Sequence, residues 1–244
     1  MQDRYAGDIG DYGKFALLRL IQLQGLSVGV NWYRVDALDS EKNKDGSFRQ
    51  KDGKYLISDK LKVCDQSLAE RLMVIADGQD RSIIGLEKEE LIPGAVYYHE
   101  KVTVSERTAW HSGGLEKLKG VQIVFLDPDN GLLVKSVGKG SARSVKYTFY
   151  EEVRDYIRQN QSVLVYNHRC RKPEKQYFQN ICEKLQAFTD VSESQILKIT
   201  FPKGSVRDYL FIPVSNEHYE KVKAAFLMIE QSIWGQMGMC RIPK

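Results

Sequence analysis

The sequence has few cysteines and no long hydrophobic run, and each absence excludes a class of protein. Its four cysteines, Cys64, Cys170, Cys182 and Cys240, form no C-x-x-C pair and lack zinc-finger spacing, so the sequence predicts neither a redox motif nor a structural zinc site. Cysteines spread this thinly suit a reducing cytosol. No apolar run approaches the ~20 residues that span a bilayer, and the opening MQDRYAGDIGD is unlike a signal peptide. We therefore expect a cytoplasmic protein without a membrane segment.

A large excess of one charge and several familiar motifs are also absent. The net charge is +4 and the pI is about 8.7. This balance permits contact with phosphate, but it is below the pI of ~9 that is typical of nucleic-acid-binding domains. The sequence contains no G-x-S-x-G elbow, no Walker loop and no H-E-x-x-H motif. The sequence therefore predicts no serine nucleophile elbow, no P-loop nucleotide site and no zinc-protease site.

Apolar runs rich in β-branched and aromatic residues alternate with amphipathic segments along the chain. Strands are expected at 27–35, 95–102, 121–127, 162–168, 195–201 and 207–214. Helices are expected at 11–25, 67–76, 81–92, 105–120, 149–160, 173–188 and 216–233. The alternation predicts a parallel sheet with helices on both faces, and the short turn PKGSV predicts that the last two strands pair as a hairpin. The predicted fold is a single α/β domain over residues 1–244, with a three-layer, Rossmann-like, mostly parallel sheet and a C-terminal antiparallel hairpin strand.

Capping residues predict where several helices begin. Asp11 is expected as the N-cap of the first helix, and capping boxes are expected at Ser67–Glu70 and Thr148–Glu151. The helix over 81–92 is expected to end at the Pro-Gly step that follows it. Residues 36–54 are polar, contain two Asp-Gly steps and are expected to form a long loop or a weak hairpin.

Two motifs resemble a known family. The order of elements, ending in a hairpin and a helix, is similar to that of the class I S-adenosylmethionine-dependent methyltransferases, and most of all to the ribosomal-RNA adenine-N6 methyltransferases with an N-terminal helix motif. GDIGDYGKFALLRLI stands where that family has its N-terminal motif, and VQIVFLDPDNGL stands where it has an apolar strand running into Asp-Pro-Pro-Tyr. The resemblance is best over 95–232 and moderate over the first 35 residues. The pairing of YAGDIGDYGKF with LDPDNGL also resembles a group of bacterial and phage-type proteins.

The resemblance implies a methyl donor, S-adenosylmethionine, and a nucleic-acid substrate, DNA or RNA. It implies that Asp127, Pro128, Asp129 and Asn130 orient an exocyclic amine for methyl transfer. The methyl donor is expected to contact Lys14, Trp32, Tyr33 and His99. The sequence departs from the family in two places. The expected glycine-rich turn after the first strand reads DALDSEKNKDG, and the aromatic residue of Asp-Pro-Pro-Tyr is replaced by Asn130, so that Trp32, Tyr147 or Phe149 would have to stack on the base.

Polar residues at two strand ends predict a site independently of the resemblance. Ligands bind beyond the carboxyl ends of parallel strands, where Asp127 closes one predicted strand. The next strand runs into VYNHRCR, so Tyr166, His168, Arg169 and Arg171 are expected beside it. Lys146 ends a basic loop that could track a phosphate backbone. We assign Lys146, His168, Arg169 and Arg171 to the substrate. The Asn-Gly step that follows Pro128-Asp129 is also a strong turn signal, so a simple turn remains the alternative interpretation.

The residues leave two other functions open. A metal-dependent nuclease or phosphoryl-transfer enzyme would use Asp127 and Asp129 to bind Mg²⁺, with Lys146, His168 and Arg171 stabilising charge on phosphate. A catalytically inactive binding or effector module on the same fold would keep the basic rim without a working donor site. No metal is assigned under the first hypothesis.

Overall fold

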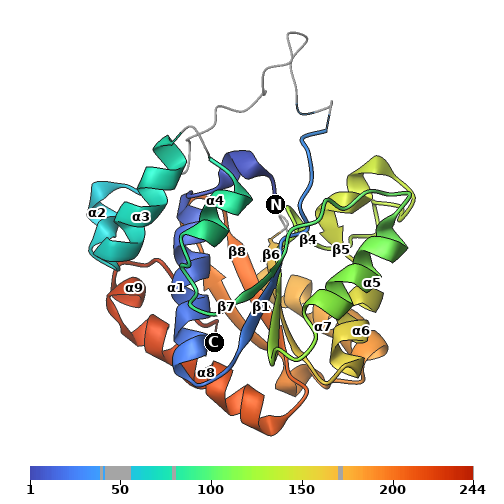
Figure 1. Ribbon diagram of the computed structural model, residues 1–244. Coiled ribbons are helices and arrows are strands. Elements are labelled where there is room, and N and C mark those ends of the chain that lie inside the picture. The colour runs from blue at the N-terminus through green and yellow to red at the C-terminus, as the bar shows by residue number, and fades with distance from the viewer. Residues whose placement is uncertain (39–40, 42–55, 79–80, 170–172, 244) are drawn as a thin grey trace.

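A computed structural model describes residues 1–38, 41, 56–78, 81–169 and 173–243. Its main sheet has the strand order β2-β1-β3-β6-β8-β7 (Figure 1). The strands are β1 (Val28–Asn31), β2 (Val96–Tyr98), β3 (Ile123–Leu126), β6 (Ser162–His168), β7 (Leu197–Phe201) and β8 (Arg207–Ile212). Strands β2, β1, β3 and β6 are parallel, whereas β8 is antiparallel to both β6 and β7. The predicted α/β fold and its C-terminal antiparallel hairpin are confirmed, and the reversed strand lies inside the sheet.

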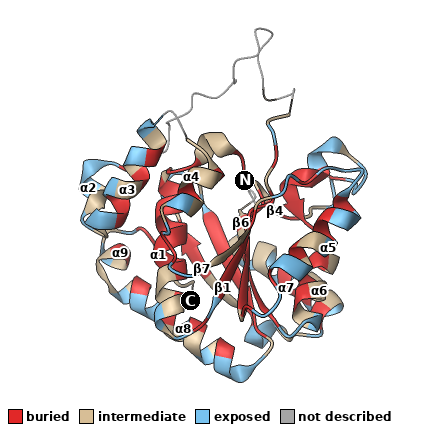
Figure 2. Cartoon of the chain, in the orientation of Figure 1, coloured by how far each residue is buried: buried red, intermediate tan, exposed pale blue. Residues whose placement is uncertain are grey.

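The central strands are buried on both faces, as their composition requires. All residues of β1 and β3 are buried, and their sequences, VGVN and IVFL, are nearly continuous apolar runs. One face is covered by α1 (Ile9–Leu23), α2 (Asp59–Lys62), α3 (Gln66–Asp77), α4 (Ile83–Lys88), α8 (Asn216–Gln231) and α9 (Ile233–Gln236). The other is covered by α5 (Arg107–Lys117), α6 (Tyr150–Arg158) and α7 (Glu174–Thr189). Each face has its own hydrophobic core, and the sheet separates the two (Figure 2).

Three helices begin at residues other than those predicted. The N-cap of α1 is Asp8, because the carboxylate of Asp11 binds the amide of Gly7 and the amine of Lys14 instead. Helix α3 is capped by Asp65, which lies two residues before the predicted cap. Helix α6 follows β5 (Tyr147–Thr148), so the predicted cap Thr148 belongs to a strand and Phe149 takes its place. When several neighbouring polar residues could cap a helix, the path of the preceding chain decides which of them takes the N-cap position.

Two other elements are shorter than predicted. Helix α4 ends at Lys88, well before the Pro-Gly step, and Glu90 adopts a left-handed conformation with φ of 46°. Strand β1 ends at Asn31 because the chain turns at Tyr33, where φ is 44°. Most of the loop predicted over 36–54 lies outside the described residues.

The topology places a ligand crevice between β1 and β3. From β1 the chain passes to β2 on one side, and it then returns across β1 to β3 on the other side. This reversal of strand order opens a crevice at the carboxyl ends of the two strands. The N-terminus lies at this end of the sheet, as Figure 1 shows. In the part of the chain that the structure describes, no helix has both the length and the apolar character needed to cross a membrane.

Candidate functional site

A pocket with a volume of about 320 Å³ opens at the carboxyl edge of the sheet. Its walls come from the N-terminal segment, the first turn of α1, the segments that follow β1, β3 and β6, and the start of β8. The lining residues are Met1, Tyr5, Asp8, Gly10, Asp11, Lys14, Glu41, Asp127, Pro128, Asp129, Asn130, Lys146, Tyr166, His168, Ser205 and Arg207. A pocket of this volume lies at the small end of the range for small-molecule and cofactor sites.

Asp127 and Lys14 form the centre of the pocket. The Lys14 ammonium lies 2.7 Å from a carboxylate oxygen of Asp127 and 2.6 Å from one of Asp11. All three side chains are at most 3% exposed. Burial lowers the pKa of Lys14, but the two carboxylates outweigh this effect and raise it. Burial raises the pKa of Asp127, and Lys14 opposes this only in part. The lysine therefore fixes the Asp127 carboxylate in place.

Asp129 and Lys146 form a second ionic group beside the first. A carboxylate oxygen of Asp129 lies 3.2 Å from the Lys146 ammonium, and the other lies 3.2 Å from the amine of Met1. Lys146 also binds Glu41 at 2.6 Å. Burial raises the pKa of Asp129, but the Met1 amine and Lys146 together hold it below its usual value. The carboxylates of Asp127 and Asp129 in the Asp-Pro-Asp-Asn motif are thus each paired with cations of the chain.

The chain turns sharply after β1, at a residue other than glycine. Tyr33 takes the left-handed φ of 44° without being glycine, a conformation that bulky residues rarely adopt. Its amide donates to the Asn31 side chain, and its hydroxyl donates to Glu152 at 2.9 Å. The carbonyls of Trp32 and Tyr33 both accept from the Met1 amine, at 3.0 and 2.8 Å. The side chain thus anchors a strained turn whose carbonyls point to the edge of the pocket.

Three of the residues assigned to the methyl donor do not line the pocket. Trp32 and Tyr33 are fully buried in the two cores. The indole of Trp32 donates to Glu87 at 2.8 Å. His99 binds the same Glu87 and is not among the residues that line the pocket. Of this predicted set, only Lys14 reaches the pocket.

The wall on the β6 side differs in part from the prediction. His168 lines the pocket, and burial together with the charge of Arg207 lowers the pKa of its imidazole. Arg169 does not line it, since its guanidinium binds Asp208 and Glu174. Arg171 lies outside the described residues. The cation that occupies this wall is Arg207, the register partner of His168 across β6 and β8.

The Asn-Gly step is both a turn and a wall of the pocket. Gly131 has φ of 110°, and a Cβ there would come within 2.2 Å of the Asn167 side chain, so only glycine fits. The glycine opens β4 (Gly131–Leu132), which pairs with β5. Asn130 precedes it in the pocket lining, and no described residue hydrogen-bonds its side-chain amide. The two interpretations of this motif are therefore compatible.

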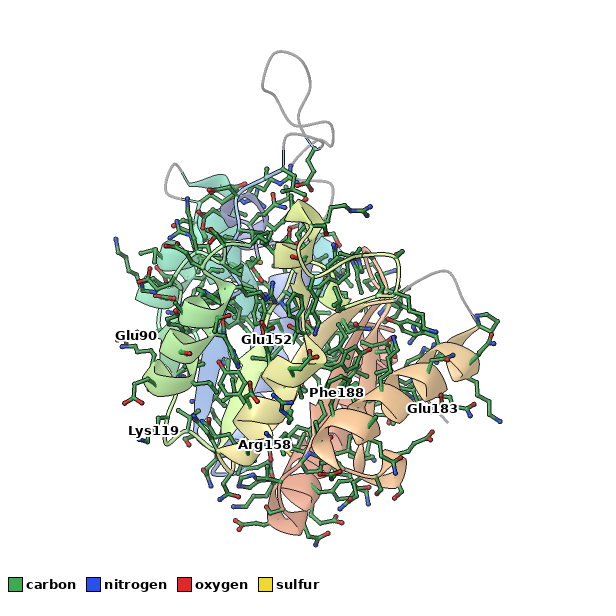
Figure 3. The ribbon with its side chains drawn as sticks, turned by 90° about the vertical axis from the view of Figure 1, so that its right-hand side faces the viewer. Glu90, Lys119, Glu152, Arg158, Glu183 and Phe188 are labelled. Carbon is green, nitrogen blue, oxygen red and sulfur yellow. The ribbon has the colours of Figure 1, made fainter. Side chains whose placement is uncertain are left out.

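The basic loop divides into an exposed part and a buried part. Lys135, Lys139 and Arg143 are exposed, and Lys139 binds Glu151. Lys146, at the end of the loop, is 6% exposed and points into the pocket. Arg107 fixes this end of the loop, because it donates to the carbonyls of Ser144 and Tyr147 and pairs with Glu152. Glu152, the partner of Arg107, lies near the middle of the view in Figure 3.

The aromatic side chains that line the pocket are not those predicted to stack on the base. Trp32 and Tyr147 are buried, and Phe149 is covered by the Arg107 guanidinium, which lies 3.6 Å from its ring centre. Tyr5 and Tyr166 line the pocket instead. Tyr5 belongs to a short 3₁₀ turn, Asp3–Tyr5, and Tyr166 lies on β6.

The charges of the pocket are balanced within the chain. The negative groups are the carboxylates of Asp8, Asp11, Glu41, Asp127 and Asp129. The positive groups of the lining are Lys14, Lys146, Arg207 and the Met1 amine. Arg4 also pairs with Glu41, at 3.4 Å, so that five cations face the five carboxylates. No group of three or more His, Cys, Asp or Glu side chains that could hold a metal ion occurs among the described residues.

Sequence reasoning missed Asp8, Tyr5, Glu41 and Arg207 as pocket residues. For Arg207 a signal was present. A strand that runs antiparallel to β6 must begin at the edge where β6 ends, so the first residue of the predicted strand 207–214 belongs beside His168. For Tyr5 and Glu41 the sequence offers no such signal, because neither lies in a regular strand or α-helix.

The fold and the pocket define a Rossmann-like α/β protein with a polar pocket at its topological switch point. Searches found no protein-family model that matches the chain and no curated protein that matches it.

Proposed function

We propose that the protein is an S-adenosylmethionine-dependent methyltransferase that acts on an exocyclic amine of DNA or RNA. The observation that carries the proposal is the pocket between the ends of β1 and β3, walled by Asp127–Asn130, in which the Asn130 side-chain amide has no partner among the described residues. A methyl donor carries a sulfonium, an ammonium and a carboxylate. The pocket is lined by both carboxylates and cations, so it offers groups of both signs to such a ligand.

The side chains of the pocket fit such a ligand better than they fit a metal ion. Asp127 and Asp129 are each bound to cations of the chain, so neither is free to ligate Mg²⁺. When bound, the methyl donor supplies an electrophilic methyl group. The turn at Tyr33 holds the Met1 amine through the carbonyls of Trp32 and Tyr33, and it thereby positions Met1 in the pocket wall.

The chain's own residues orient the acceptor amine and exclude water. Asn130 presents a side-chain amide without a partner among the described residues, and its oxygen can accept a hydrogen from the amine. Lys14 holds the carboxylate of Asp127, the first residue of this wall. Methyl transfer is an in-line displacement, so the rate depends on the position of the amine and on its desolvation.

The basic loop supports a nucleic acid as the substrate. Lys135 and Arg143 are exposed on the same loop that brings Lys146 into the pocket. A strand bound along the loop would therefore be led toward the pocket. Replacing Lys135 and Arg143 with alanine should reduce the salt dependence of binding, because each lost phosphate contact lowers the slope of log K against log salt by about 0.7–0.9.

Calorimetric titration with S-adenosylmethionine is the first test. The wild type should bind it, and it should bind S-adenosylhomocysteine more weakly because that product lacks the sulfonium charge. The second test is transfer of a radiolabelled methyl group to DNA and RNA. Asn130→Ala should abolish transfer while leaving the melting temperature unchanged, and Asn180→Ala, on the exposed face of α7, is the matched control. A wild type that neither binds the methyl donor nor transfers its methyl group would refute the proposal and leave a binding module.

A further inference from the structure

A carboxylate and a guanidinium lie on either side of the first turn of α1. Asp8 precedes the helix, and its Oδ1 accepts from the amides of Gly10 and Asp11, at 2.6 and 3.0 Å. Among the described residues, none donates a hydrogen bond to its second oxygen, Oδ2. Asp8 lines the pocket, so this oxygen is an acceptor that a ligand can reach. It differs from Asp127 in this respect, because Lys14 holds the Asp127 carboxylate at 2.7 Å.

Arg207 is the donor on the opposite side, and the fold fixes its direction. Its side chain is only 5% exposed. Its Nη1 donates to the carbonyls of Lys203 and Ser205, at 2.8 and 3.2 Å. No hydrogen bond joins Arg207 to Asp8 directly. A donor held this firmly is suited to recognising one ligand atom.

Gly10 lies between the two groups. A Cβ at this position would lie 2.8 Å from Oδ1 of Asp8 and 3.1 Å from Nε of Arg207, so a side chain there would displace at least one of them. Asp8, Gly10 and Arg207 all line the pocket, and the two groups therefore face the same hollow. The φ of Gly10 is not in the left-handed region, so backbone conformation does not require glycine here. The positions of Asp8 and Arg207 are the feature that glycine preserves.

An acceptor beside a donor complements a base edge that carries an amine beside a ring nitrogen. Adenine and cytosine have such edges. We infer that Asp8 accepts a hydrogen from the exocyclic amine of adenine or cytosine, while Arg207 donates to the adjacent ring nitrogen. This inference rests on the proposed action on a nucleic-acid amine, and it names the residues that read the base. A primary amine has two hydrogens, so one can bind Asp8 while the other faces the Asp127–Asn130 wall.

Asp8 is ionised at neutral pH and above, although its pKa is raised to about 6. Burial is the largest cause and Asp11 contributes, while Arg207 and Lys14 lower the pKa. The titratable Tyr166, on β6, also interacts electrostatically with Asp8. Recognition of an amine needs the carboxylate as an acceptor, so the preference for an amine should be present at pH 7.5 and should weaken as the pH falls below about 6.

The test compares two single-stranded oligonucleotides, one of adenine and one of N6,N6-dimethyladenine, by fluorescence anisotropy. The second has no N–H to give to Asp8. The wild type should bind the adenine strand about tenfold more tightly, which is within the range for one paired base contact. Asp8→Asn keeps a helix-capping oxygen but replaces the free acceptor with a donor, so the preference should be lost or reversed. Gly10→Ala fills the hollow and should also remove it.

Asp65→Asn is the matched control, because Asp65 caps α3 in the same way and lies outside the pocket. It should retain the tenfold preference. Equal affinity of the wild type for both strands, or no binding of either, would overturn the inference, and so would a preference that survives both substitutions. If Asp8→Asn fails to fold, the loss or retention of the preference in Gly10→Ala tests the inference. The preference without binding of S-adenosylmethionine would refute the methyltransferase alone, and donor binding without the preference would refute the base-reading pair alone.

Discussion

Replacing Lys14 with methionine removes the cation that bridges two buried carboxylates. The ammonium lies 2.6 Å from Asp11 and 2.7 Å from Asp127, and the three side chains are at most 3% exposed. Methionine has a similar length and no charge, so the cavity stays filled while the charge is lost. Removing one partner of a buried ion pair costs about 3–5 kcal/mol, because the remaining charge is left in a medium of low polarity. Here two carboxylates remain, so we expect a loss of unfolding free energy in the upper part of that range.

The loss should depend on pH in a definite direction. Burial already raises the pKa of Asp127, and without the lysine the pKa rises further. A carboxyl whose pKa is higher in the folded than in the unfolded state contributes stability at low pH and loses it as the pH rises through the folded value. The variant should therefore recover part of its stability relative to the wild type between pH 7 and pH 4.

Urea unfolding followed by circular dichroism measures these differences. Lys62→Met is the control, because Lys62 pairs with Asp59, whose side chain is 92% exposed. Such a surface pair contributes about 0–1 kcal/mol. The double variant Lys14→Met with Asp127→Asn removes one of the two unpaired charges and should regain a substantial part of the loss. A loss below about 1 kcal/mol in Lys14→Met, or a double variant no more stable than the single one, would refute the argument that the ion triad is desolvated.

Further predictions concern the pocket wall and the buried arginine. The pKa of Asp8 is raised to about 6, above its unfolded value of 3.8, so its contribution to stability is present below the unfolded value and is lost as the pH rises through 6. Asp8→Asn should gain on the wild type by on the order of 2 kcal/mol between pH 4 and pH 7, measured by urea unfolding at each pH. Arg107→Met should lose about 3–5 kcal/mol, since Arg107 pairs with the buried Glu152 through two nitrogens. Its control, the exposed Arg158→Met, should change by less than about 0.5 kcal/mol, and equal losses in the two would contradict the assignment.

Local patterns in the sequence predicted most of the elements and one wall of the pocket. Apolar runs predicted the strands, and the position of Asp127 at the end of such a run placed the motif at the carboxyl edge of the sheet. The helix caps were placed less well. Asp8 and Asp11 are both good capping residues, and the choice between them follows from the contact of Asp11 with Lys14.

The partners of the charged residues required the tertiary structure. Arg169 and Arg207 both lie at the edge that holds the pocket, but Arg169 binds Asp208 whereas Arg207 faces Asp8. Their neighbours in the sequence do not distinguish them. The same holds for the aromatic residues, since Trp32 fills a core and Tyr166 lines the pocket.

By itself, the sequence determined that strands alternate with helices and that a polar motif follows the third strand of the sheet. Hydrophobic periodicity is a local property, because each segment must bury its own apolar face. The tertiary structure alone decided that Lys14 meets Asp127, 113 positions away, and that Asp8 and Arg207 share one hollow. The position of a charge relative to distant charges depends on how the helices and strands pack, and one segment's sequence does not contain that information.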